Sequence, residues 1–257
     1  MAKGKLSDIF KNILGKKSGP RGDLKDLIAQ AAQDPSDLRL RLQIGKMYFK
    51  QKDVRNGIAW YREVAEKYVE DEFVLKAIAI YKEILKYSPG SVEFNEALGD
   101  LFMKVGIVAD AAQQYQIVIH YHLTHHQPED ALRVGQKLVT AQPDEVQHRL
   151  RLAEIYFNQG KEAESLAEYE NIARQLRKEM KQLDVLAEVY EKILLKRPKE
   201  MQLLRELCIF YLKLKNPQKA IRKIERYKLE KDQQFKPIYE KALQLKDMLA
   251  KSGEGGS

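Results

Sequence analysis

Hydrophobic residues along this chain recur at the three- and four-residue spacing of amphipathic helices, and no segment alternates as a half-buried strand would. Short turns marked by Gly106, Gly160 or Pro217 separate several of these stretches. The pattern therefore predicts an all-α chain. The expected helices span residues 24–33, 38–51, 54–69, 73–87, 92–105, 108–125, 129–141, 145–158, 161–179, 183–196, 200–214, 217–229 and 233–250.

The helices repeat with a long period. A small residue recurs at Gly45, Gly99, Ala153 and Cys208, in steps of 54, 54 and 55 residues. An aromatic residue follows each of them three places later, at Tyr48, Phe102, Tyr156 and Tyr211. Further small residues open the next helix at Gly57, Ala111, Ser165 and Ala220, and prolines precede each repeat at Pro35, Pro89, Pro143 and Pro198. Each repeat is therefore expected to hold three helices, in which small residues let neighbouring helices approach closely.

This succession of small, aromatic and proline positions resembles the tetratricopeptide repeat. The usual repeat has about 34 residues and two helices, whereas here the middle helix of each longer unit is shared by two overlapping motifs. The resemblance implies a right-handed superhelix (α-solenoid) of about 12–13 antiparallel helices over residues 22–250. Residues 1–21 are then a basic amphipathic segment with a hinge, and residues 251–257 a flexible tail.

The resemblance also implies a function. Stacked helical repeats present an extended concave surface, on which proteins of this family hold a peptide, a helix or a small globular partner. We therefore expect a non-catalytic adaptor or scaffold. The long units look like those of bacterial cytoplasmic tetratricopeptide proteins from species with polarity and surface-motility systems, which suggests a motility regulator such as a small GTPase as partner.

One set of apolar residues is a candidate for the partner-binding surface. It stands four places after each small residue and forms an apolar ladder of Phe49, Met103, Phe157 and Leu212. Either the apolar face of a partner helix binds there, or the third helix of each repeat or a terminal helix covers it. Charged residues beside the ladder would discriminate between partners by sign; they are Lys46, Lys50, Glu96, Asp100, Glu154 and Arg205.

The segment before the repeats carries its own apolar stripe, formed by Leu6, Ile9, Phe10, Ile13 and Leu14 among lysines. Such a helix can cover the open end of its own superhelix or dock on a partner. It can instead lie on an anionic membrane surface. The alternative function is therefore a peripheral membrane-attached scaffold that uses residues 1–17.

Candidate chemistry changes this picture little. The sequence contains no phosphate-binding loop, zinc-protease motif or nucleophile elbow, so we expect neither an enzyme, nor a cofactor, nor a small-molecule substrate. The only cysteine, Cys208, occupies a small-residue position and should be packed in the core. The net charge is +8, but an apolar ladder flanked by charges of both signs argues against nucleic acid, which needs a uniformly basic surface.

Four histidines gather between His120 and His126 and raise the question of a metal site. One period earlier His122 aligns with Tyr68, a packed aromatic position, whereas the other three align with acidic residues. We therefore expect His122 to point inward, the others to face solvent, and no metal to bind. Neither a signal peptide nor an apolar membrane span is recognisable, and we expect a cytoplasmic protein.

Overall fold

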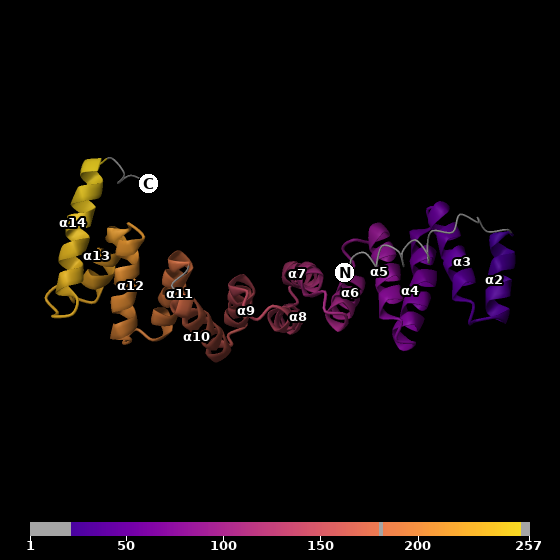
Figure 1. Ribbon diagram of the computed structural model, residues 1–257, viewed down its shortest axis with the longest axis horizontal. Helices are drawn as coiled ribbons and strands as arrows, with labels where there is room; N and C mark the ends of the chain where they lie inside the picture. Colours follow the sequence, from indigo (N-terminus) through magenta and orange to yellow (C-terminus); the bar gives the residue numbers. More distant parts are fainter. Residues whose placement is uncertain (1–21, 180–181, 253–257) are drawn as a thin grey trace. The chain divides into compact units, whose positions relative to one another are not determined.

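The structure is a computed structural model that describes residues 22–179 and 182–252. These residues form thirteen helices and no strand, as the sequence predicts (Figure 1). The chain divides into two compact units, Met1–Glu145 and Val146–Ser257, called here the N-terminal and the C-terminal unit. Within each unit, helices pack mainly against their neighbours in sequence, as expected of stacked repeats.

Within the described residues, the N-terminal unit contains one helix that precedes the repeats, followed by the six helices of the first two repeats. They are α2 (Leu24–Gln33), α3 (Leu38–Lys50), α4 (Val54–Glu70), α5 (Val74–Tyr87), α6 (Val92–Lys104), α7 (Val108–Thr124) and α8 (Pro128–Ala141). The C-terminal unit contains α9 (Val146–Asn158), α10 (Glu162–Glu179), α11 (Leu183–Lys196), α12 (Met201–Lys213), α13 (Pro217–Arg226) and α14 (Lys236–Ser252).

The turn between the first two helices has the same conformation in every repeat. One residue adopts a left-handed backbone, with φ of 63° at Lys52, 73° at Gly106, 71° at Gly160 and 54° at Lys215. These positions are again 54, 54 and 55 residues apart. Glycine adopts such a φ freely, whereas lysine does so at a cost. The repeat seen in the sequence is therefore a repeat of backbone conformation.

The small residues of the repeat lie where aromatic rings from the next helix press on the backbone. A Cβ atom added at Gly45 would lie 2.5 Å from Cδ1 of Tyr61, and one at Gly99 would lie 2.7 Å from Cε1 of Tyr115. Atoms this close overlap, so a larger side chain would force the two helices apart. Close pairing of the helices thus explains both the small residues and the aromatic residues of the repeat.

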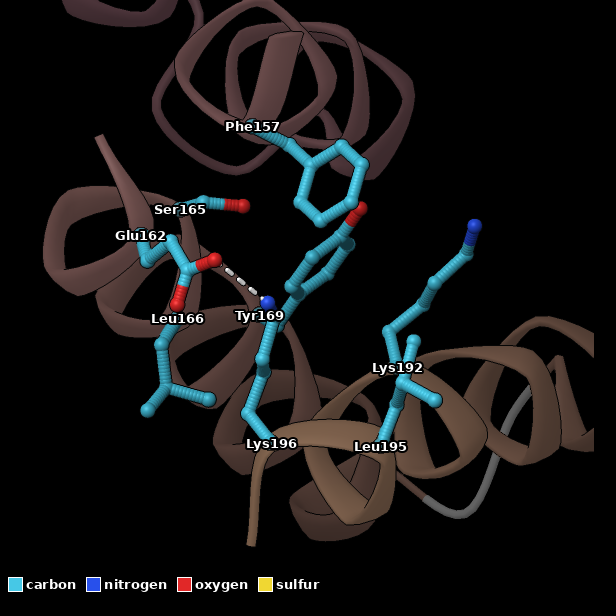
Figure 2. A pocket seen from close by; sticks show the side chains of 8 residues that line it. All are labelled: Phe157, Glu162, Ser165, Leu166, Tyr169, Lys192, Leu195 and Lys196. Atoms are coloured by element: carbon cyan, nitrogen blue, oxygen red, sulfur yellow. Dashed lines mark hydrogen bonds and ion pairs between the residues drawn. The ribbon is translucent and has the colours of Figure 1, made fainter. Parts of the chain in front are cut away.

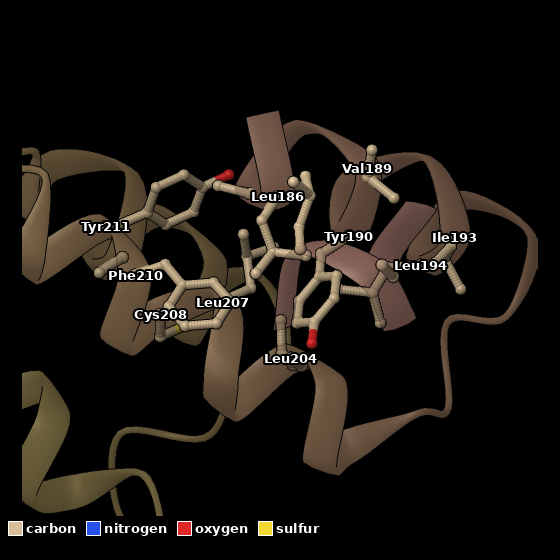
Figure 3. Close-up of a cluster of buried hydrophobic side chains, with 14 of the residues drawn as sticks. Leu186, Val189, Tyr190, Ile193, Leu194, Leu204, Leu207, Cys208, Phe210 and Tyr211 are labelled. Atoms are coloured by element: carbon tan, nitrogen blue, oxygen red, sulfur yellow. The ribbon is translucent and has the colours of Figure 1, made fainter. Parts of the chain in front are cut away.

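The core of the C-terminal unit joins α11 and α12 (Figure 3). Leu186 and Tyr190 meet Leu207, Cys208 and Phe210 there, and the rings of Tyr190 and Phe210 are 5.4 Å apart. Cys208 is fully buried, and its burial raises the pKa of the thiol to about 12. It is the packed core thiol that its position predicts.

The histidine-rich stretch is a helix junction. Helix α7 ends at Thr124, His126 has a φ of 55°, and α8 begins at Pro128. His122 is only 6% exposed, and its Nδ1 lies 2.8 Å from Oε1 of Gln127, while His120, His125 and His126 are exposed. The predicted orientation of the four side chains is confirmed.

The largest difference from the expected helix boundaries lies between the last two helices. Helix α13 ends at Arg226 rather than at residue 229, because Lys228 has a φ of 57° and the Leu229 amide turns back to the Ile224 carbonyl. Helix α14 begins at Lys236 rather than at residue 233. Asp232 accepts a hydrogen bond from the Gln234 amide at 2.8 Å, which holds a turn before that helix.

Candidate partner-binding surface

The first residue of the apolar ladder is not available to a partner. Phe49 is only 8% exposed. Its ring stacks on Tyr87 with a centroid distance of 3.8 Å and an interplanar angle of 2°, and it meets Tyr61 edge-on at 5.1 Å. Tyr87 closes the third helix of the first repeat, α5. Phe49 therefore follows the alternative in which the third helix covers the ladder, and its ring is buried within the fold.

A glycine on α4 makes this burial possible. A Cβ atom added at Gly57 would lie 2.5 Å from Cδ1 of Phe49, so the phenyl ring rests directly on the helix backbone. No other residue leaves room for a ring at that depth. The stack on Tyr87 then covers the outward side of the ring.

The second and fourth residues of the ladder are intermediate cases. Met103 and Leu212 are both half-buried. Leu212 packs against the core of the C-terminal unit, so its apolar surface is partly used within the fold. Neither side chain offers a partner a fully exposed anchor.

Phe157, the third residue of the ladder, is 46% exposed. It stands 108 positions after Phe49, and the residue 108 positions after Gly57 is Ser165. Ser165 is buried and donates a hydrogen bond from Oγ to the Ala153 carbonyl at 2.9 Å. A serine side chain therefore stands at the position where Gly57 lets the Phe49 ring rest on the helix backbone.

The residue that covers the ring also differs. Lys196 stands 109 positions after Tyr87, which is the separation of Pro89 and Pro198. Its Nζ lies 5.4 Å from the centre of the Phe157 ring, and it forms an ion pair with Glu162 at 2.6 Å. The flexible side chain of Lys196 thus lies over the Phe157 ring, where the aromatic ring of Tyr87 stacks on Phe49 in the first repeat.

Together these changes open a small pocket in the C-terminal unit (Figure 2). It is lined by the end of α9, the first half of α10 and the end of α11, through Phe157, Glu162, Ser165, Leu166, Tyr169, Lys192, Leu195 and Lys196. Leu195 is 69% exposed, a large value for a leucine. This surface, called here the Phe157 pocket, combines an apolar centre with a basic rim of Lys192 and Lys196.

The size of the Phe157 pocket limits what can enter it. Its volume is about 40 Å³, whereas sites for small molecules usually enclose roughly 300–1,000 Å³. The pocket holds the tip of one apolar side chain rather than a cofactor.

The acidic residues beside Met103 are engaged within the fold. Glu96 is paired with Arg133, whose Nη2 donates to Oε2 at 2.9 Å, and Nζ of Lys137 lies 2.8 Å from both Glu96 and Asp100. Asp100 also accepts a 2.7 Å hydrogen bond from Tyr115. The hydrogen bonds from Arg133, with those from Lys137, lower the pKa of Glu96 to about 2. Both carboxylates, predicted to contact a partner, are thus paired with cations of α8 within the fold.

The remaining predicted charges vary in exposure. Lys46, Lys50 and Glu154 are exposed, so they stay candidates for contact with a partner. Arg205 is half-buried, and its Nε has no hydrogen-bond partner within the described residues. The docking residues predicted near the N-terminus, Leu6, Ile9, Phe10, Ile13 and Leu14, lie outside the described residues.

Metal ligands and membrane-spanning helices would each leave a recognisable arrangement. Among the described residues, no group of three or more histidine, cysteine, aspartate and glutamate side chains is placed to hold a metal ion. In the same part of the chain, no helix has both the length and the apolar character needed to cross a membrane.

Sequence reasoning singled out Phe157 as a partner-binding residue but none of the seven other residues that line the Phe157 pocket, among them Lys192, Leu195 and Lys196 on α11. A signal for them exists in the repeat. The step from Pro143 to Pro198 is 55 residues rather than 54, and once this extra residue is counted, Lys196 aligns with Tyr87. A lysine where the first repeat has Tyr87 indicates that a different side chain lies over the ladder residue in the third repeat.

Consecutive helix pairs with small residues at their crossings place the chain in the class of all-α helical-repeat proteins. Residues 119–179 match the family model for the tetratricopeptide repeat. The predicted resemblance to the tetratricopeptide repeat is confirmed over this segment, and the predicted all-α fold class is confirmed over the described residues. No curated protein matches the chain.

Several solved structures are similar to it at low identity. A crystal structure of MamA protein is 18% identical, with a TM-score of 0.23, over 76% of this chain and 94% of that chain. YrrB, described as a TPR protein with an unusual peptide-binding site, is 10% identical, with a TM-score of 0.27, over 90% and 99%. BtubC (BKLC) from P. vanneervenii is 15% identical, with a TM-score of 0.33, over 90% and 93%. Such low scores say nothing about the partner of this chain.

Proposed function

We propose that this chain is a non-catalytic adaptor that binds a helix, a peptide or a small globular protein through the Phe157 pocket. The observation that carries the proposal is the exposed ring of Phe157, at a repeat position where Phe49 is buried. The tetratricopeptide fold supports it, because stacked helical repeats typically serve to hold protein partners.

The composition of the pocket suggests how a partner binds. A leucine or methionine side chain of the partner can enter between Phe157 and Leu195 and remove both apolar surfaces from water. Such a contact contributes about 25 cal/mol for each Å² of apolar surface buried. Anchors of this kind, surrounded by a polar rim, dominate the binding free energy of many interfaces.

The rim supplies selectivity. Lys192 and Lys196 flank the apolar centre, and Glu162 holds Lys196 at 2.6 Å. A carboxylate of the partner beside the apolar anchor would compete with Glu162 for Lys196. Rim charges of this type change the rate of association and the choice of partner more than the affinity.

The test compares the partners captured by three forms of the full chain. The first is wild type, the second carries Phe157→Lys and Leu195→Lys, and the third carries Met248→Lys. Met248 is 59% exposed and lies on α14 in the same unit, so it controls for adding a lysine at an exposed apolar site.

We expect at least one protein partner to be retained by wild type and by the Met248 variant, and lost by the double variant. Binding of the purified partner, measured by isothermal titration calorimetry, should fall at least about tenfold, a loss of about 1.4 kcal/mol. Circular dichroism must show that all three forms are folded. An identical set of partners for all three forms would remove the Phe157 pocket as the binding site.

A further inference from the structure

A second groove lies on the C-terminal unit, between the later part of α10, α11 and the start of α12. It encloses about 470 Å³ and is lined by Glu170, Ala173, Arg174, Arg177, Lys178, Tyr190, Ile193, Arg197, Glu200 and Leu203. None of these residues belongs to the Phe157 pocket. The groove, called here the basic groove, is more than ten times larger and offers space for several side chains of a partner.

The centre of the basic groove is apolar. Ala173, Tyr190 and Ile193 are buried, and Leu203 is half-buried. Glu206 fixes the Tyr190 hydroxyl by a hydrogen bond of 3.0 Å. A partner side chain that reached this centre would therefore find a fixed apolar surface.

Cationic side chains surround this apolar centre. Two of the four are neutralised within the fold, because Arg177 pairs with Glu206 at 2.7 Å and Arg197 pairs with Glu170 at 2.5 Å. Arg174 has only a 3.3 Å hydrogen bond to the Asn171 side chain, and Lys178 has no ion pair among the described residues. The groove therefore holds two cations, Arg174 and Lys178, that no carboxylate of the described residues satisfies.

The two preceding repeats carry no lysine or arginine at the positions of these four cations. The corresponding residues one repeat earlier are His120, Leu123, Thr124 and Gln142, and two repeats earlier they are Glu66, Val69, Glu70 and Ser88. None of them is lysine or arginine. Arg177 and Lys178 lie in the last turn of α10, where a positive charge favours the helix, but Arg174 lies outside that turn. The basic groove is thus a feature of the third repeat alone.

We infer that the basic groove binds an acidic segment of a protein partner, with Asp or Glu side chains on Arg174 and Lys178 and an apolar side chain over Tyr190 and Ile193. Arginine suits this role because its planar guanidinium binds a carboxylate through two parallel hydrogen bonds. A nucleic acid fits less well, since a phosphate chain follows a continuous basic track, whereas Glu170 and Glu200 interrupt this one. The inference does not depend on the Phe157 pocket.

The test uses a fluorescein-labelled peptide of about fourteen residues, rich in glutamate with a single central leucine. Its binding to the full chain is measured by fluorescence anisotropy. The test variant carries Arg174→Glu and Lys178→Glu. The matched control carries Arg222→Glu and Arg226→Glu, which change the net charge equally at exposed positions of α13 in the same unit.

We expect the test variant to weaken binding at least about tenfold and the control to stay within about twofold of wild type, because charges in contact act far more strongly than distant ones. The test variant should in turn bind a lysine-rich version of the peptide better than wild type does. The Phe157→Lys variant should bind the acidic peptide as wild type does, which separates this inference from the proposed function.

Three results would overturn the inference. The first is no measurable binding of the acidic peptide to the folded wild type. The second is an equal loss in the test variant and in the control, which would show that net charge alone attracts the peptide. The third is stronger binding of a single-stranded RNA oligonucleotide or of phosphatidylserine vesicles than of the peptide, with the same dependence on Arg174 and Lys178.

Discussion

Phe49 in the N-terminal unit and Phe157 in the C-terminal unit occupy the same repeat position, but Phe49 is buried and Phe157 is exposed. Phe49 rests on Gly57 beneath Tyr87, whereas Phe157 stands beside Ser165 beneath Lys196. The phenylalanine is the same at both positions, and the difference in its exposure accompanies a difference in these two neighbours. At equivalent positions of a repeat fold, burial of the same residue type can therefore differ with its neighbours.

The largest expected effect separates the two phenylalanines by stability. Phe49→Ala should lower the free energy of unfolding by about 3–4 kcal/mol, because it removes a buried ring and leaves a cavity. Phe157→Ala should lower it by less than about 1 kcal/mol, since half of that ring is already in water. Urea unfolding measures both. Trp60, the only tryptophan, lies on α4 and reports on the N-terminal unit by its fluorescence. Equal losses in the two variants would contradict the comparison.

The next effect tests the role of the glycine. Gly57→Ser should destabilise the N-terminal unit by about 1–3 kcal/mol, because the new side chain overlaps the Phe49 ring. Gly90→Ser is the control, since nothing lies within 4 Å of a Cβ atom at that position. Thermal unfolding followed by Trp60 fluorescence compares the two. If Gly57→Ser were as stable as wild type, Ser165 could not explain the exposure of Phe157.

A smaller effect depends on pH and sharpens the comparison of charges. The pKa of Glu96 is about 2 in the folded chain, below its ordinary value of 4.5, so its contribution to stability is complete above pH 4.5 and is lost as the pH falls toward 2. Glu96→Gln should lower stability at pH 7 by about 1 kcal/mol, because solvent already weakens the pair with the half-exposed Arg133. The free energy of unfolding of this variant should also fall less steeply between pH 4.5 and 2 than that of wild type.

The corresponding residue of the third repeat is Leu150, so this source of acid sensitivity is not repeated there. Leu150→Ala serves as the control. It should lower stability without changing the slope between pH 4.5 and 2. Urea titrations at several pH values measure both variants, and parallel curves for Glu96→Gln and wild type would show that the Glu96 ion pairs contribute nothing.

The smallest expected change in stability converts one site into the other. The double variant Ser165→Gly, Lys196→Tyr gives Phe157 the neighbours that Phe49 has. It should stabilise the C-terminal unit by about 0.5–1.5 kcal/mol through the new aromatic stack, and it should abolish binding of a partner at the Phe157 pocket. Urea unfolding by circular dichroism and calorimetry with that partner measure the two effects. Retained binding would show that the ring of Phe157 is not the anchor.

Much of the fold could be predicted from the sequence, because helix periodicity, turn residues and a repeat all indicate the same structure. The inward direction of His122 and the burial of Cys208 followed from the repeat register alone. The burial of Phe49 and the exposure of Phe157 could not be predicted in this way, since glycine and serine both count as small residues in the pattern. The difference between Gly57 and Ser165 matters only because a Cβ atom added at Gly57 would lie 2.5 Å from the ring of Phe49.

The pairing of Glu96 was equally hidden from sequence reasoning. Its partners Arg133 and Lys137 lie 37 and 41 positions away on α8. The expectation that charged residues beside the ladder select partners by sign considered only the helix that carries the ladder. Ion pairs between the first and the third helix of a repeat depend on how those helices are placed, and the period of the sequence does not report that placement.

The local packing of the helices has a consequence for how the chain folds. Each described helix contacts mainly the helices next to it in sequence, so few contacts require a long loop to close first. Chains with such low contact order fold quickly, and repeat arrays can begin to fold at more than one point. A single repeat can therefore acquire a new surface, as the third has done, while its neighbours still nucleate as before.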